Sequence, residues 1–298
     1  MTHPSPPARE TCRARLVLAA LACMTVVPDG TGAKPAEQPA PRPYCQPALF
    51  NVALDIGHDR AKPGAISATG ATEFEYNLSL GHAVIEALRQ AGFSAAFLIG
   101  ESGAPLTIER RVKIAMDTHA VLLVSLHHDS VQPRYFSDWT VDGRLQHYSD
   151  AFHGYSLFIS GKNGHEHESR EFAMLLGEAL LGQGLTPSLH HAEKIRGENR
   201  PLLDAKLGLY RFNDLEVLKT APMPAALLET GIIVNRREEQ EIRNGPYHKL
   251  VAAALVKAIR GFCSMHADGR YRLSAGLRRG KATAVGALNA GEHTRGAP

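Results

Sequence analysis

Cysteine is scarce in this chain of 298 residues, and the four present lack the C-x-x-C spacing of a metal or redox site: Cys12, Cys23, Cys45 and Cys263. Apolar runs are also short. The run at residues 16–27 is about twelve residues long, which is too short to span a bilayer. The net charge is only +3, and much of it lies in the flanks, so a nucleic-acid partner is not indicated. No internal repeat is visible.

The N-terminal region has the pattern of an export signal. Three arginines lie within residues 1–15, ahead of the apolar run, and small residues follow it at 31–33. This arrangement predicts a signal peptide over residues 1–33, and therefore an exported protein that is periplasmic or secreted. A buried N-terminal helix and lipid attachment at Cys23 are the alternatives.

The rest of the chain divides by composition. Residues 34–47 are proline-rich and polar and predict an exposed linker, and residues 48–264 alternate between strand-like and helix-like segments. Residues 265–298 are rich in Gly, Ala and Arg and predict a basic, disordered tail. In an oxidising compartment Cys45 and Cys263, which bracket the domain, are candidates for a disulfide; two free thiols are the alternative.

The alternation within the domain predicts the fold class. Apolar runs with strand character are LFNVALDIG, SAAFLIG, AVLLVSL and PMPAALLETG. Segments with helical spacing separate or follow them, including EYNLSLGHAVIEALRQAG, LTIERRVKIAMDTH, SREFAMLLGEALLGQG and PYHKLVAAALVKAIRGF. We therefore expect a single α/β domain with a largely parallel, twisted sheet that helices cover on both faces.

Four polar residues lie at or beside the ends of apolar runs. His58 closes LDIGH, Glu73 lies in GATEFEYNL, His127 in VLLVSLHHDS and Glu229 in AALLETG. Ligands of such sheets gather beyond the carboxyl ends of the strands, where three of these residues would meet. Two histidines and a carboxylate can hold zinc with a position left for water, and a second carboxylate can accept that water's proton.

Each candidate also has a plainer interpretation. His58 could be a turn histidine, and Glu73 could simply interact with a helix dipole. Glu75 competes with Glu73 for the role of ligand. His127 and His128 are adjacent, so only one of them can readily point into a shared site.

At these residues the chain resembles the zinc-dependent N-acetylmuramoyl-L-alanine amidases that cleave bacterial peptidoglycan. The family pattern runs D-P-G-H, G-A, G-x-x-E-K-x-x-N-L, R-x-x-x-A-N, S-I-H-x-N/D-A and L-x-E-x-G-F-x-x-N. The corresponding segments here are LDIGH, PGA, GATEFEYNL, RRVKIA, SLHHDS and LLETGIIVN, in the same order over roughly residues 50–262.

The resemblance implies a role for each residue. One zinc ion would be held by His58, Glu73 and His127, because these positions match the family's ligands. The neighbouring residues Glu75 and His128 do not match. Glu229 would be the general base and later the proton donor. Arg111 matches an arginine of the helix before the histidine strand, and we interpret it as structural.

The implied reaction is hydrolysis of the amide between N-acetylmuramic acid and L-alanine in peptidoglycan. Export agrees with this, since that substrate lies outside the cytoplasm. Some family positions differ here: Ile56 replaces proline, Asp59 and Arg60 replace glycines, Met116 replaces asparagine, and Ile232 replaces phenylalanine. None removes a ligand or the base, but they bear on the shape of the substrate groove.

Residues 131–225 form a long polar stretch that the pattern describes poorly. The HEHE cluster at 165–168 has the residue types of a second metal site, but we expect a solvated loop before a helix. Arg196, Asn199 and Arg200 are candidate groove residues by weak resemblance. Related amidases can carry an inserted helix that covers the zinc until a protein activator displaces it, and this stretch is long enough to contain one.

Three functional hypotheses therefore stand. The first is a peptidoglycan amidase. The second is a zinc amidohydrolase of similar architecture that acts on a small N-acyl amino acid, against which the predicted signal peptide and the L-x-E-x-G segment argue. The third is a non-catalytic cell-wall binder on the same scaffold, against which the intact ligands and base argue.

Overall fold

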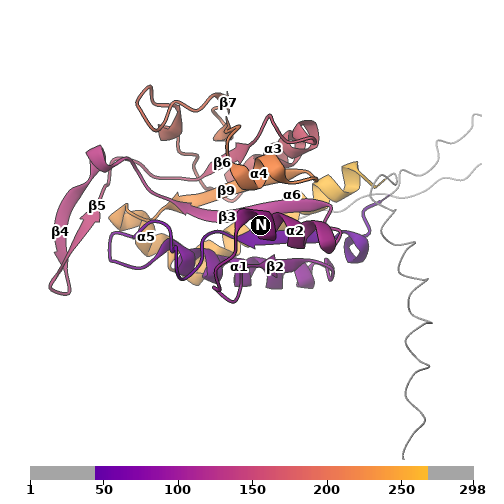
Figure 1. Cartoon of the computed structure of the whole chain (residues 1–298), viewed down its shortest axis with the longest axis horizontal. Coiled ribbons are helices and arrows are strands. Elements are labelled where there is room, and N and C mark those ends of the chain that lie inside the picture. Colours follow the sequence, from indigo (N-terminus) through magenta and orange to yellow (C-terminus); the bar gives the residue numbers. More distant parts are fainter. Residues whose placement is uncertain (1–43, 268–298) are drawn as a thin grey trace, which may run out of the picture. The chain divides into compact units, whose positions relative to one another are not determined.

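A seven-stranded mixed sheet lies at the centre of the computed structural model, which describes residues 44–267 (Figure 1). Its strand order is β2-β1-β3-β9-β6-β8-β7. The strands are β1 (Val52–Ile56), β2 (Phe97–Ile99), β3 (Leu122–Asp129), β6 (Ser156–Ile159), β7 (Leu202–Asp204), β8 (Leu209–Arg211) and β9 (Ala225–Ile232). The α-helices are α1 (Glu73–Gln90), α2 (Ile108–Asp117), α3 (Glu166–Gly182), α4 (Glu216–Thr220), α5 (Arg236–Ile242) and α6 (Gly245–Met265).

Helices cover both faces of this sheet, as the sequence predicts. One core contains residues of α1, α3 and α6 packed on β1, β3, β6 and β9, and a second contains residues of α2 and α4 on the opposite face. Alternate residues of each strand therefore point to different cores. This is why the central strands are apolar without interruption rather than alternating with polar residues.

The first four strands of this order are parallel to one another, and β6 and β8 form a second parallel pair that runs in the opposite direction. β2, β1, β3 and β9 run in one direction, whereas β6 is antiparallel to β9 and β7 is antiparallel to β8. The carboxyl ends of β1, β3 and β9 consequently lie at one edge. That edge is where three of the four candidate site residues were expected.

The stretch 131–225 contains structure that the sequence did not reveal. Apart from α3, which is the helix predicted from SREFAMLLGEALLGQG, it forms β6, β7, β8 and α4. It also forms a hairpin of β4 (Ser137–Val141) and β5 (Arg144–Tyr148), which projects from one end of the domain in Figure 1. It also forms short 3-10 turns, η2 (Pro133–Tyr135) and η3 (His190–Ala192). The strands are only three to five residues long, and so short a run carries little periodicity.

The acidic-histidine cluster at 165–168 is not a loop, contrary to the expectation. His165 is the N-cap residue of α3, and Glu166 and Glu168 lie in its first turn. Acidic side chains are favoured there by the positive end of the helix dipole. The His167 side chain is 82% exposed, so the cluster is solvated but helical.

The predicted disulfide partners are joined in the structure. Cys45 and Cys263 form a disulfide between the start of the described chain and the last turns of α6. Cys45 also packs against the core, so this end of the predicted linker is attached to the domain. A short 3-10 turn, η1 (Pro47–Leu49), then leads into β1.

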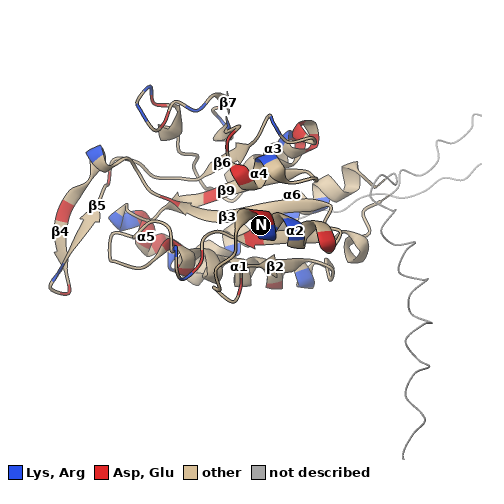
Figure 2. Ribbon diagram, viewed as in Figure 1, with Lys and Arg blue, Asp and Glu red and all other residues tan. Residues whose placement is uncertain are grey.

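The predicted signal peptide, most of the linker and nearly all of the predicted tail lie outside the described residues. Within residues 44–267, no helix combines the length and apolar character needed to cross a membrane. Lysine, arginine and acidic residues are interspersed over the helices and loops of this part (Figure 2).

Candidate metal centre

The three predicted zinc ligands converge at the carboxyl edge of the sheet. His58 follows β1, Glu73 is the first residue of α1, and His127 lies near the end of β3. His58 Nε2 is 3.0 Å from Glu73 Oε2, and His127 Nδ1 is 2.9 Å from Glu73 Oε1. One ligand atom from each of the three lies within 4.8 Å of the others.

The first turn of α1 separates the two competing glutamates. Glu75 forms a capping box with Thr72: its carboxylate accepts the Thr72 backbone N–H at 2.9 Å, and the Thr72 hydroxyl accepts the Glu75 N–H at 3.3 Å. Glu75 is exposed, and its carboxylate is engaged in capping the N-terminus of α1. Glu73 is 5% exposed and also accepts the Ala65 N–H at 3.0 Å. Glu73 is therefore the glutamate that faces the two histidines.

Strand geometry separates the two adjacent histidines. Successive residues of β3 point to opposite faces of the sheet. His128 is buried under α1, where its Nδ1 lies 2.8 Å from Asn77 Oδ1, and burial lowers its pKa to about 3. His127 points to the other face, toward Glu73.

Two glycines make room for the cluster. A Cβ atom at Gly57 would lie 2.3 Å from the His127 ring, and a Cβ at Gly64 would lie 2.3 Å from Glu73 Oε2 and 2.6 Å from His58. Gly64 also has a φ of +78°, in the region that favours glycine. His58 itself has a φ of 67°, a conformation that a non-glycine residue keeps only when its surroundings hold it.

Arg111 of α2 holds the chain that carries His58. Its guanidinium is 5% exposed and donates to Asp55 Oδ1 at 2.7 Å and to the carbonyl oxygens of Ile56 and His58. Asp55 Oδ2 accepts the Ser125 hydroxyl at 2.8 Å. Arg111 thus acts on the backbone around His58, which is the structural role expected from the sequence.

The electrostatics of the cluster favour an anionic Glu73. Burial alone would raise the pKa of Glu73, but hydrogen bonds with His127 and His58 outweigh it and hold that pKa well below its usual range. Burial lowers the pKa of His58, but the hydrogen bond with Glu73 and the negative charge of that carboxylate act against burial, and the pKa is raised. One carboxylate and two imidazoles on three elements are a donor set that fits zinc.

Glu229 lies next to this cluster on the neighbouring strand. It is in register with His127 between β9 and β3, so both side chains project to the same face. Its Oε2 atom is buried without a hydrogen-bond partner among the described residues. Burial, together with the charges of Asp129 and Glu73, raises the pKa of Glu229. A carboxyl with a raised pKa beside a metal-ligand set can exchange protons with a substrate.

A cavity of about 190 Å³ adjoins Glu229. Gly197 and Arg200 line it, and the Arg200 guanidinium lies 3.7 Å over the Phe212 ring. Arg196 and Asn199, the other groove residues expected from the sequence, are exposed on the same loop and do not line this cavity.

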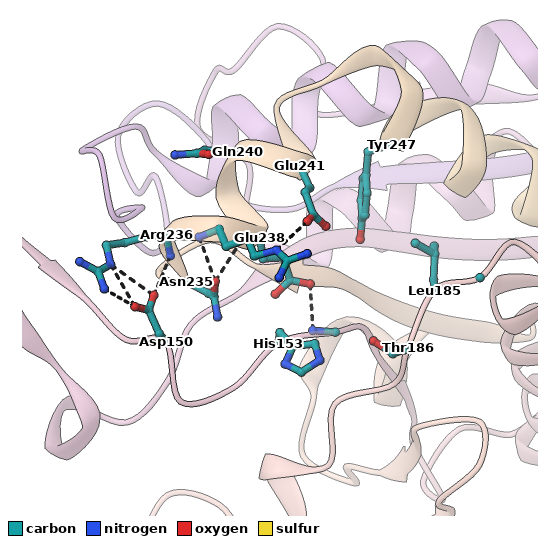
Figure 3. Close-up of a pocket in the computed structure, with 13 residues that line it drawn as sticks. Asp150, His153, Leu185, Thr186, Asn235, Arg236, Glu238, Gln240, Glu241 and Tyr247 are labelled. Carbon is teal, nitrogen blue, oxygen red and sulfur yellow. Dashed lines mark hydrogen bonds and ion pairs between the residues drawn. The ribbon is translucent and has the colours of Figure 1, made fainter.

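A larger cavity, of about 730 Å³, lies elsewhere, and none of the four site residues lines it (Figure 3). Glu238 is at its wall, where its carboxylate accepts the backbone N–H groups of Gly154 at 2.8 Å and Ile232 at 3.0 Å. Burial raises the pKa of Glu238 to about 7 despite these hydrogen bonds. The Arg236–Asp150 ion pair lies at another part of the wall, as Figure 3 shows.

Sequence reasoning missed a second cluster of ligand-type side chains. Asp129, His190 and His191 bring one carboxylate oxygen and two imidazole nitrogens within 4.8 Å of one another. The signal was present as the pair of histidines in LHHAEK, but residues 131–188, including the predicted helix SREFAMLLGEALLGQG, separate it from SLHHDS. Nothing local to either segment indicates that they meet.

Residues 52–261 match the model of the N-acetylmuramoyl-L-alanine amidase family. The chain belongs to this family. The family resemblance expected from the sequence is therefore confirmed, and with it the assignment as a hydrolase of this class. A putative N-acetylmuramoyl-L-alanine amidase of Buchnera aphidicola subsp. Baizongia pistaciae is 25% identical over 214 residues, which are 71% of this chain and 95% of the relative.

Solved amidase structures share the fold. The catalytic domain of CwlV, an N-acetylmuramoyl-L-alanine amidase from Bacillus (Paenibacillus) polymyxa var. colistinus, superposes with a TM-score of 0.52 at 22% identity, covering 71% of this chain and 96% of that one. Ami1 from Mycobacterium smegmatis gives a TM-score of 0.55 at 18% identity, covering 72% of this chain and 97% of that one. The expected α/β fold of the amidase catalytic domain is thus confirmed.

Proposed function

We propose that this amidase hydrolyses the bond between the lactyl group of N-acetylmuramic acid and L-alanine with one zinc ion held by His58, Glu73 and His127. The observation that carries the proposal is the convergence of these three side chains at one sheet edge, with Glu229 in register beside them. When bound there, zinc lowers the pKa of water to about 7 and polarises a carbonyl.

Glu229 performs the proton transfers in this proposal. Its carboxylate accepts a proton from the water whose oxygen attacks the lactyl carbonyl carbon. The carbon–nitrogen bond then breaks, and Glu229 returns the proton to the departing amine nitrogen of L-alanine. The products are the free carboxyl group of the muramic acid and the free stem peptide, so no other co-reactant is needed.

Location and partners follow from the substrate. Peptidoglycan lies outside the cytoplasm, and we therefore propose that the chain is exported, by the signal peptide predicted at residues 1–33. Regulation by a protein activator also stays a prediction. The α-helices found within 131–225, α3 and α4, pack in the two cores, and neither has the place expected of a covering helix.

The test is digestion of purified peptidoglycan by the full chain, with zinc or with a chelator, beside a Glu229→Gln variant. We expect zinc-dependent release of free stem peptides from intact glycan, read by mass spectrometry, and a loss of at least about 100-fold in the variant, the usual contribution of a general base. A small N-acyl amino acid supplied as substrate is expected to remain intact. Cleavage of that compound alone would select the amidohydrolase hypothesis instead.

A matched pair of variants tests the assignment of the carboxylate ligand. Glu73→Gln is expected to abolish both zinc binding and activity, because it removes the anion shared by the two histidines. Glu75→Gln should keep both and lose at most about 1 kcal/mol of stability, because this residue only caps α1. Zinc content and unfolding midpoint are measured for both, and the opposite pattern would reassign the ligand.

A further inference from the structure

Three side chains converge at a second point beside Glu229. His191 Nε2 lies 2.8 Å from Asp129 Oδ2, and His190 Nε2 lies 3.4 Å from the same oxygen. The two imidazole rings have centroids 3.9 Å apart. With zinc–ligand distances of about 2.0–2.2 Å, neighbouring ligand atoms of a tetrahedral site lie about 3.3–3.6 Å apart. The separation of 3.4 Å has this spacing, the one of 2.8 Å is somewhat shorter, and all three ligand atoms lie within 4.8 Å of one another.

The other polar atoms of these side chains are held by neighbours. The Ser188 hydroxyl lies 2.9 Å from His190 Nδ1, and Glu198 Oε2 lies 2.8 Å from His191 Nδ1. Asp129 Oδ1 accepts the Ser130 N–H at 2.7 Å. Metal-binding histidines usually have their second ring nitrogen fixed in this way, by a carboxylate or another polar group. The atoms that face one another are therefore the Nε2 atom of each ring and Asp129 Oδ2.

Because these side chains are buried, bringing their polar atoms together without a bound cation costs free energy. His190 is 3% exposed and Asp129 is 9% exposed. His190 Nε2 is buried and has no hydrogen-bond partner among the described residues. Leaving such an atom unpaired usually costs about 1–3 kcal/mol. A cation at the convergence point would pair with this nitrogen, with His191 Nε2 and with the carboxylate together.

We propose that Asp129, His190 and His191 form a second site for a divalent cation, with zinc the best fit to two imidazoles and one carboxylate. The ion joins the end of β3 to the loop that begins at η3 and continues to β7. That loop carries Gly197 and Arg200, which line the cavity beside Glu229. The second ion thus fastens one wall of this cavity to the sheet.

The competing interpretation is an ion network without metal. An imidazolium at His191 between the carboxylates of Asp129 and Glu198 would also fit the two distances of 2.8 Å. It would leave His190 Nε2 with only the 3.4 Å contact to Asp129 Oδ2 and without a hydrogen bond, however. The two interpretations differ in the number of ions bound, which can be counted without substrate and independently of the amidase reaction.

The experiment counts zinc in the full chain after metal removal, reloading and dialysis, by elemental mass spectrometry. We expect two ions in the wild type and one in His191→Ala. His58→Ala/His127→Ala, which leaves the second cluster intact, should also keep one. His167→Ala, at an exposed histidine of α3, should keep two. An equal count in wild type and a folded His191→Ala overturns the proposal.

A second measurement covers the case in which His191→Ala does not fold. His58→Ala/His127→Ala is then decisive, because its single expected ion can reside only in the second cluster. Zinc should raise the unfolding temperature of this variant, and cobalt in place of zinc should give the visible absorption of a bound ion. A folded His58→Ala/His127→Ala chain with no bound ion would leave only the metal-free network.

Discussion

Removing the guanidinium of Arg111 should damage both stability and zinc binding, although this residue touches no ligand side chain. The Arg111→Met variant leaves Asp55 buried at 2% exposure with only the Ser125 hydroxyl as a partner. Breaking a buried ion pair from one side typically costs about 3–5 kcal/mol, since the remaining charge is uncompensated. The carbonyl oxygens of Ile56 and His58 lose a donor at the same time.

The effect on zinc comes from the backbone of His58. This residue is held at a φ of 67°, and the donation from Arg111 to its carbonyl oxygen fixes it in that conformation. Losing an outer contact of a metal ligand typically lowers metal affinity by about 10–100-fold. We therefore expect Arg111→Met to weaken zinc binding within that range while His58, Glu73 and His127 are all intact.

The assay is urea unfolding in chelator, which removes the stabilisation that bound zinc would add, followed by competition for zinc with a coloured chelator. Arg110→Met, at the exposed neighbour on α2, is the control and should change neither quantity. Asp55→Asn/Arg111→Met should recover part of the stability, because no unpaired buried carboxylate is left. It should not recover the zinc affinity. An unfolding free energy within about 1 kcal/mol of wild type in Arg111→Met would refute the reasoning.

The remaining predictions concern the disulfide, a buried acid and the histidine pair. Cys45→Ser/Cys263→Ser should lower the unfolding free energy by about 2–5 kcal/mol, because the bridge constrains an unfolded loop of 218 residues; an unchanged urea midpoint would contradict this. The pKa of Glu238 is raised from 4.5 to about 7, so the folded state binds its proton more tightly than the unfolded chain. This tighter binding adds roughly 3 kcal/mol to the free energy of unfolding below about pH 4.5, and the added stability is lost as the pH rises to 7. Urea unfolding across this range should show the loss in wild type and not in Glu238→Gln. Finally, His127→Asn should remove one bound zinc whereas His128→Asn should not, and equal losses in both would reject the assignment.

Much of the fold was predictable because its central elements are long and strongly patterned. The segments VALDI, LLVSLHHD and AALLETGI are apolar runs buried on both faces, and the helices between them have regular apolar spacing. The capping residue Thr72 places Glu73 and Glu75 in the first turn of α1. Since parallel strands bring their carboxyl ends to one edge, the meeting of His58, His127 and Glu229 could also be expected.

The strands between β3 and β9 were not predictable in the same way. β6, β7 and β8 are three or four residues long and lie near polar loops, so their pairing depends on partners that are distant in the sequence. The direction of β6 is one such outcome. It pairs antiparallel to β9, and no feature of SLFI specifies that direction.

Local pattern and motifs in the sequence are enough to indicate the family, the α/β order of elements and the chemical types of the four residues of the first centre. The family pattern also favoured Glu73 over Glu75 and His127 over His128, and the tertiary structure supplies the physical reason for both choices. Glu75 is taken up by the cap of α1 and His128 by the core. Only the tertiary structure shows that His190 and His191 meet Asp129, across 60 residues that contain the β4–β5 hairpin, β6 and α3. The physical reason is that side-chain direction and long-range contact are set by packing of the whole domain, whereas propensity and periodicity act over only a few residues.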